Sequence, residues 1–180
     1  MTKSQPISES ATDTTFATVR QSFEGHPHLK PSLAQANVIL LPMFDSERNG
    51  EPVFGTNVRD VYQALAKRAD DGVFVELAYD GDSPPKLVLH GDLFVFGTLL
   101  VTHVVLPIVV GVLSSIIYDR VRSRSRKLDE TEVRCTFVIE EADGTARRLD
   151  YNGPASSFER LVNNRTLPAP VDRSVIKDDD

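Results

Sequence analysis

Five cations lie close together ahead of residue 128, and they form the part of the sequence with the clearest chemical use. The run reads RVRSRSRK, and its cations are Arg120, Arg122, Arg124, Arg126 and Lys127. Guanidinium and ammonium groups at this density bind phosphate, either on lipid head groups or on nucleic acid. The cluster directly follows a long apolar run, a position typical of a juxtamembrane anchor. We therefore predict that it binds anionic lipid in preference to nucleic acid.

Other side chains with catalytic or metal-binding chemistry are scattered along the chain. His26 and His28 are two imidazoles without further ligands, and the acidic turn at Asp80 lacks the twelve-residue pattern of a calcium loop. His90 lies two residues before Asp92, but no serine or cysteine occupies a recognisable nucleophile turn. Cys135 falls on the apolar face of a predicted strand, where a thiol is an inert core group. The sequence thus predicts no catalytic residue, no metal site and no cofactor.

The composition is that of one folded domain with a modest acidic charge. Of 180 residues, 41% are apolar and 26% are charged, and 26 acidic side chains outnumber 20 basic ones for a net charge of −6. The apolar content excludes a fully disordered chain, and the single cysteine excludes an internal disulfide framework. Residues 1–92 carry a net charge of −5, residues 119–127 carry +4 and residues 128–180 carry −5. Two acidic parts therefore flank the basic segment.

The apolar run covers residues 93–118 and contains no formal charge. As one helix its 26 residues would extend about 39 Å, which exceeds the roughly 30 Å hydrocarbon core of a bilayer. We predict a transmembrane helix whose apolar surface includes Leu93, Phe96, Leu100, Leu106, Val110, Leu113 and Ile117. The alternative is a buried segment that folds back within an α+β domain or lies at a subunit interface, because Val and Ile also suit buried strands.

Three residues within this run would have a special position in a membrane helix. An imidazole in hydrocarbon is costly unless it is neutral and paired, so it tends to face a helix interface or water. Glycine permits close approach of a second helix. We predict helix contacts in a homo-oligomer at Gly97, His103 and Gly111. The alternative is that His103 bonds a carbonyl of its own helix.

The chain divides into six segments by pattern and composition. We predict a disordered tail at 1–35, a β-α-β-β unit at 36–92, the apolar segment at 93–118, a basic collar at 119–127, a ββα unit at 128–163 and an acidic disordered tail at 164–180. The first unit has strands at 37–44, 73–79 and 86–90, and its helix covers 56–68. The predicted fold class is α+β.

The ββα unit has the clearest strand pattern. Residues 132–140 alternate between apolar and polar, and Asp143-Gly144 is a two-residue hairpin signal before a partner strand at 146–151. A short helix then begins at Pro154. About 35 residues are too few to fold alone, so this unit completes a sheet with the first unit or packs on a partner. A shared sheet requires both units on one side of a membrane, which favours the alternative in which 93–118 folds back.

The order of these elements resembles that of the small effector-associated components of bacterial conflict (defence) systems. The resemblance covers residues 37–162 and consists of strand, helix and strand, a Gly-punctuated apolar segment, the arginine cluster DRVRSRSR at 119–126, and the hairpin at Asp143-Gly144 followed by a helix. It implies a non-catalytic adaptor that couples a separate effector enzyme to a sensor or a membrane. It implies no catalytic residue.

Three functional hypotheses follow, and the third, an enzyme, is kept only because active sites without a recognisable motif exist. In the first, the chain is a membrane-anchored adaptor, and the positive-inside rule places its C-terminal unit in the cytoplasm. The side occupied by the N-terminal unit stays open, because the first 30 residues contain no apolar core of a signal peptide. In the second, the chain is a soluble cytoplasmic α+β component of a larger assembly, with the apolar segment buried at a subunit interface.

Overall fold

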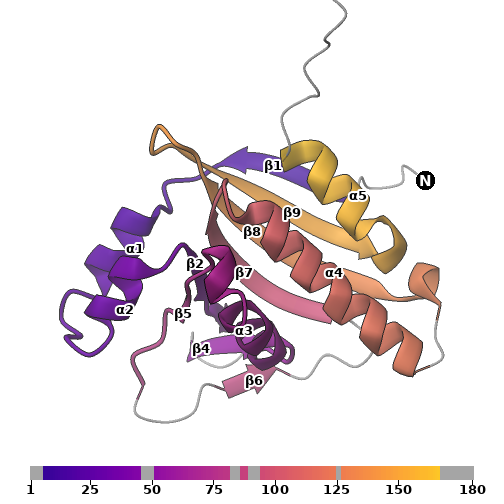
Figure 1. Ribbon diagram of the computed structural model, residues 1–180, viewed down its shortest axis with the longest axis horizontal. Helices are drawn as coiled ribbons and strands as arrows, with labels where there is room; N and C mark the ends of the chain where they lie inside the picture. Colours follow the sequence, from indigo (N-terminus) through magenta and orange to yellow (C-terminus); the bar gives the residue numbers. More distant parts are fainter. Residues whose placement is uncertain (1–5, 46–50, 82–85, 89–93, 125–126, 167–180) are drawn as a thin grey trace, which may run out of the picture.

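The computed structural model describes residues 6–45, 51–81, 86–88, 94–124 and 127–166. These residues form an α+β fold with a mixed six-stranded sheet and a separate three-stranded sheet (Figure 1). The strands are β1 (Ile7–Ala11), β2 (Val38–Leu41), β3 (Met43–Asp45), β4 (Glu51–Gly55), β5 (Val75–Leu77), β6 (Lys86–Val88), β7 (Phe94–Thr102), β8 (Glu132–Glu140) and β9 (Ala146–Pro154). The α-helices are α1 (Phe16–Ser22), α2 (Lys30–Gln35), α3 (Val58–Ala66), α4 (Leu106–Ser123) and α5 (Ala155–Thr166).

The large sheet has the strand order β1-β9-β8-β7-β2-β5, so both predicted units contribute to it. β7 pairs in parallel with β8 and antiparallel with β2, which joins the two halves of the chain. The hypothesis that the ββα unit completes a sheet with the N-terminal unit is therefore confirmed. The small sheet has the order β3-β4-β6.

The single apolar helix predicted over residues 93–118 is wrong. Residues 94–102 form the central strand β7, residues 103–105 form a turn, and α4 begins at Leu106. Aromatic and β-branched residues favour a strand in the first half. Pro107 lies in the first turn of α4, where its missing N–H is not needed for a helical hydrogen bond. None of the helices within the described ranges is long and apolar enough to cross a bilayer.

β7 can be apolar along its length because both faces of this part of the sheet are covered. On one face Leu99 and Val101 belong to the main core beneath α3 and α4. On the other face Leu100 packs in a second cluster with residues of α1 and α2. Gly97 has a φ of +76° at a bulge between β7 and β8, a conformation that glycine adopts without strain. The fold-back alternative for the apolar run is the one that the structure shows.

The layer of α3, α4 and α5 covers one face of the large sheet (Figure 1). α4 lies between the other two helices and contacts both. The residues of α4 that face the sheet are fully buried. Near the end of α4, Arg120 pairs with Asp60 of α3 and donates a hydrogen bond of 2.7 Å to Oδ1 of Asn57, the N-cap residue of α3. α5 packs Phe158 edge-on against Tyr151 of β9, with ring centroids 5.1 Å apart.

The disordered tail predicted at 1–35 is wrong for the described residues 6–35. β1 pairs antiparallel with β9, and α1 and α2 cover the second face of the sheet. The N-terminus of α1 is capped by Thr15 and by the carboxylate of Glu140, which accepts from the N–H of Phe16 at 2.7 Å. A carboxylate is favourable here because helix N-terminal N–H groups lack intrahelical partners. The tail predicted from residue 164 also begins too early, since α5 continues to Thr166, and residues 167–180 lie outside the described ranges.

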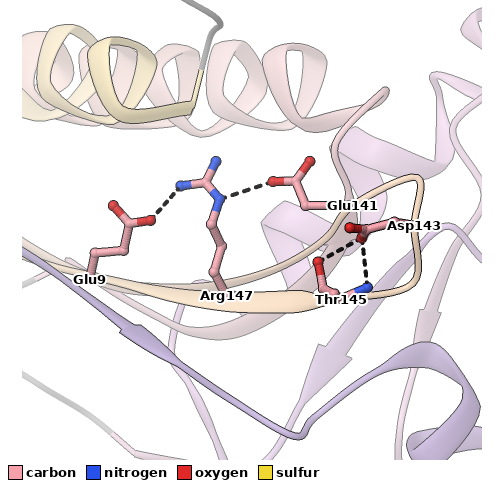
Figure 2. A network of polar contacts seen from close by, with 5 residues as sticks. All are labelled: Glu9, Glu141, Asp143, Thr145 and Arg147. Carbon is pink, nitrogen blue, oxygen red and sulfur yellow. Dashed lines mark hydrogen bonds and ion pairs between the residues drawn. The ribbon is translucent and has the colours of Figure 1, made fainter.

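An arginine of β9 ties β1 to the β8–β9 hairpin. Figure 2 shows Glu9 and Glu141 on opposite sides of Arg147, whose guanidinium nitrogens lie 3.1 Å and 2.9 Å from their carboxylates. In the turn, Asp143 accepts from both the N–H and the hydroxyl of Thr145, and these hydrogen bonds lower the pKa of the Asp143 carboxyl. The predicted hairpin is confirmed, although its loop covers residues 141–145 rather than two residues, and Gly144 has a φ of +82°.

Candidate interaction surface

The outward side of α4 carries an apolar surface that the fold does not cover. We call this the α4 face, and it consists of Val104, Pro107, Gly111, Ser115 and Tyr118. Val104 is 70% exposed and Tyr118 is 43% exposed, and both are among the most exposed large hydrophobic residues of the described chain. Residues spaced by three or four positions share one side of a helix, so Pro107, Gly111, Ser115 and Tyr118 form a continuous stripe. Two large hydrophobic side chains, Val104 and Tyr118, therefore stand at the ends of this stripe.

A groove of about 420 Å³ runs beside the α4 face, between α4 and α3. It is lined by Ala64, Lys67 and Arg68 on the α3 side and by Gly111, Ser115 and Asp119 on the α4 side. Gly111 is exposed, and no heavy atom lies within 4 Å of the position that a Cβ atom would take there. The groove is thus lined by small residues, by the apolar Val112 and Ile116, and by charged residues from both helices.

The predicted helix-contact residues do not lie together. Gly97 sits at the β7 bulge inside the sheet, so its assignment to a helix contact is wrong. His103 is exposed in the turn before α4, and its backbone N–H donates to the carbonyl of Glu140 at 3.1 Å. Gly111 lies at the middle of the α4 face. Two of the three residues therefore lie along or beside the face, although not in a membrane helix.

The predicted span residues lie in the interior of the fold rather than on one lipid-facing helix. Leu93 lies outside the described residues, Phe96 and Leu100 belong to β7, and the remaining four are buried on the inward side of α4. Those four are Leu106, Val110, Leu113 and Ile117. Their apolar character is used to pack α4 onto the sheet.

The five predicted lipid-binding cations differ in their surroundings. Arg120 is half-buried against Asp60 and Asn57, so its guanidinium is part of the packing between α3 and α4. Lys127 Nζ lies 3.0 Å from the carboxylate of Glu130 on the surface. Three residues remain, of which Arg122 and Arg124 are exposed and Arg126 lies outside the described ranges. The cluster is therefore not one uniform lipid-binding collar.

A second polar cluster lies on the face of β8 and β9 that is opposite α5. Asp150 accepts from the Thr136 hydroxyl at 2.6 Å and from two guanidinium nitrogens of Arg148 at 2.8 Å and 2.9 Å. The hydrogen bond from Arg148 is the main cause that lowers the pKa of the Asp150 carboxyl, and the bond from Thr136 lowers it further. The ion pair runs along β9 from Arg148 to Asp150, the Thr136 hydrogen bond joins it to β8, and the arrangement offers no unpaired catalytic acid.

Three further reactive groups, Cys135, Tyr151 and His26, are buried or paired. Burial raises the pKa of the Cys135 thiol well above its usual range, in agreement with the predicted inert core residue. Burial also raises the pKa of Tyr151 to about 12, and its hydroxyl donates to the Pro154 carbonyl. His26 Nε2 lies 3.0 Å from the carboxylate of Asp80. Within the described residues, no group of three potential metal ligands lies close enough to hold a metal ion. His90 lies outside the described residues.

Sequence reasoning missed the α4 face because it treated residues 93–118 as uniformly apolar. Pro107, Gly111 and Ser115 are less apolar than the buried residues between them, and they recur at intervals of four. This weak helical period marks the outward side of α4. The signal is visible only once the helix is known to begin at Leu106.

Comparison of the chain with known proteins adds no assignment of family or fold relative. No protein family, curated protein or solved structure matches it.

Proposed function

We propose that this chain is a non-catalytic interaction module that acts as an adaptor, and that the α4 face is its docking surface. The observation that carries the proposal is the exposure of Val104 and Tyr118 at the two ends of an apolar stripe. Complete burial of a fully exposed large apolar side chain contributes about 1.5–3 kcal/mol, and Val104 and Tyr118 have 70% and 43% of their surfaces left to bury. A helix fixed on a sheet also loses little conformational entropy on binding. Both effects favour a protein partner at this surface.

The role implied by the sequence resemblance agrees with such a surface. An adaptor in a bacterial defence system binds an effector or a sensor and needs no reactive groups of its own. The groove beside α4 has Lys67 and Arg68 on one edge and Asp119 on the other, so it can select a partner by charge as well as by shape.

Photo-crosslinking in the cells that produce the protein tests this proposal. A photoreactive amino acid at position 118 is compared with one at Asn152, which is exposed on β9 on the opposite face of the sheet. We expect discrete crosslinked products from position 118 and none from position 152. The absence of products from position 118, or the same products from both positions, would contradict the proposed docking surface.

Binding of anionic lipid is a second candidate function. It is favoured by the exposed guanidinium groups of Arg122 and Arg124, for which the described part of the chain provides no acidic partner. A cation near an anionic lipid surface contributes about 1 kcal/mol. Flotation with vesicles that contain anionic lipid tests it, with the doubly substituted Arg122→Gln, Arg124→Gln chain as the comparison. Equal flotation of the two proteins would exclude these cations as the lipid site.

A further inference from the structure

β5 is an edge strand of the large sheet, and its sequence makes it prone to pair with a further strand. It stands at one end of the strand order, and β2 is its neighbour among the described strands. Residues 73–78 read VFVELA, in which Glu76 is the one charged side chain. Phe74, directly before the strand, is 49% exposed. A short apolar edge with high β propensity is a site at which a second chain can add a strand.

The backbone hydrogen bonds of β5 show which groups an added strand would use. The N–H of Ala78 donates to the carbonyl of Leu40 on β2 at 3.0 Å. The carbonyl of Phe74 accepts from the N–H of Val38 on the same strand at 3.1 Å. Successive residues of a strand direct their backbone groups to opposite sides. Leu77, which precedes Ala78, therefore directs its N–H and C=O away from β2, toward the outer side of the edge.

Both outward groups of Leu77 are occupied by its neighbours in the sequence. Its N–H donates to the Glu76 carboxylate at 2.9 Å, and its carbonyl accepts from the N–H of Tyr79 at 2.9 Å. The side chains of Val75 and Leu77 pack against the main core, so the Glu76 side chain begins on the opposite face of the strand. Its carboxylate bends around the edge to reach the Leu77 N–H. A strand that adds here must first displace this carboxylate.

Displacement of the carboxylate is unfavourable. A carboxylate accepts a hydrogen bond more strongly than a neutral carbonyl does, and an added strand offers only a carbonyl in its place. The partly buried Glu76 would also lose this donor. We infer that Glu76 forms an autoinhibitory contact that blocks strand addition at the β5 edge. β5 and α4 are separate elements, so this block is independent of the docking function proposed for the α4 face.

Sedimentation of the full chain at increasing concentration tests the block, because β5 of a second copy supplies the added strand in purified protein. Glu76→Ala removes the acceptor, and it should associate at a concentration at least about tenfold lower than the wild type does. Glu76→Val should do the same, and valine favours a strand, which maintains the fold if alanine weakens β5. Glu76→Gln keeps an acceptor oxygen and should behave as the wild type. The matched control is Glu9→Ala on the other edge strand, where the carboxylate pairs with Arg147, and no added association is expected.

Amide hydrogen exchange locates the contact. In Glu76→Ala, exchange over residues 74–78 should slow as the concentration rises, because N–H groups of the edge then bond to the second copy. Three results would each overturn the block: Glu76→Ala and Glu76→Val that associate no more than the wild type, Glu9→Ala that associates equally, or slower exchange only in elements other than β5. Association of Glu76→Gln as readily as of Glu76→Ala would also overturn it, since the hydrogen-bond acceptor then has no effect.

Discussion

Replacement of Arg120 by methionine tests whether this cation holds α4 to α3 or serves a phosphate ligand. Its guanidinium donates to Asn57 Oδ1 at 2.7 Å and pairs with the carboxylate of Asp60. Methionine keeps much of the aliphatic stem, so the substitution removes the polar contacts with little loss of packing. If the contacts matter, the variant unfolds more easily; if Arg120 only binds lipid, its stability is unchanged.

The size of the effect follows from the burial of the two partners. Asn57 is only 2% exposed, and leaving its buried carbonyl oxygen without a donor costs about 1–3 kcal/mol. The Asp60 side chain is 40% exposed, and an ion pair of this kind contributes about 0–1 kcal/mol. We therefore expect Arg120→Met to lower the free energy of unfolding by about 2 kcal/mol, mostly because of Asn57. For a domain of this size the melting temperature should fall by about 4–8 °C.

Urea unfolding of four variants checks this reasoning. Asp60→Asn should cost less than about 1 kcal/mol, and Arg122→Met, which changes an exposed cation two residues away, should lie within about 0.5 kcal/mol of the wild type. Combining Arg120→Met with Asn57→Leu should recover part of the loss, because both polar partners are then absent. The reasoning is refuted if Asp60→Asn costs as much as Arg120→Met, or if Arg120→Met has no effect on unfolding.

Three further predictions concern the sheet and its first helix. The hydrogen bond from Arg148 is the main cause that lowers the pKa of Asp150 in the folded state. The ionised Asp150 therefore stabilises the fold above its unfolded pKa of about 4. This stabilisation is lost as the pH falls through the lower pKa of the folded state. Between pH 7 and pH 3 the free energy of unfolding, measured by urea titration at several pH values around this pKa, should therefore fall less for Asp150→Asn than for the wild type. Glu140→Gln replaces the charged acceptor of the Phe16 N–H by a neutral one. Amide hydrogen exchange should therefore become faster in α1, while exchange in the sheet should change less. Gly97→Ala should lower the free energy of unfolding by about 1–2 kcal/mol in thermal or urea unfolding, because the φ of +76° disfavours a side chain.

The hairpin of β8 and β9 is the part of the fold that the sequence predicts most closely. Residues 132–140 form β8 with the expected alternation, in which Cys135 and Phe137 are buried and Arg134 is exposed. Strict alternation and a turn dipeptide are local signals, because one uncovered face requires polar residues at every second position. The helix predicted over residues 56–68 is also confirmed in outline by α3. Local patterns were sufficient for these elements, each of which has one buried side with a regular apolar period.

The central strand and the first helices could not be found in the same way. β7 is buried on both faces, and a short run that is apolar on both faces does not distinguish a strand from a helix. The cover on the second face comes from α1 and α2, whose few buried residues, such as Phe16 and Leu33, lie in a polar sequence. Their position over β7 depends on contacts with residues far along the chain, such as Glu140. β4 was not predicted, and among the described residues it pairs with β3 and β6 in the small sheet.

The apolar run of residues 93–118 also shows why the candidate site was hidden. Such a run satisfies a membrane criterion through its total hydrophobicity, whereas a folded domain needs apolar residues only where two layers meet. β7 and the inward side of α4 account for most of the run, and they include Leu100, Leu113 and Ile117. Val104 and Tyr118 remain after this core is complete, because no described element covers them. Apolar residues that the core does not bury are available for contact with a partner. The proposed interaction surface consists of such residues and carries no sequence motif.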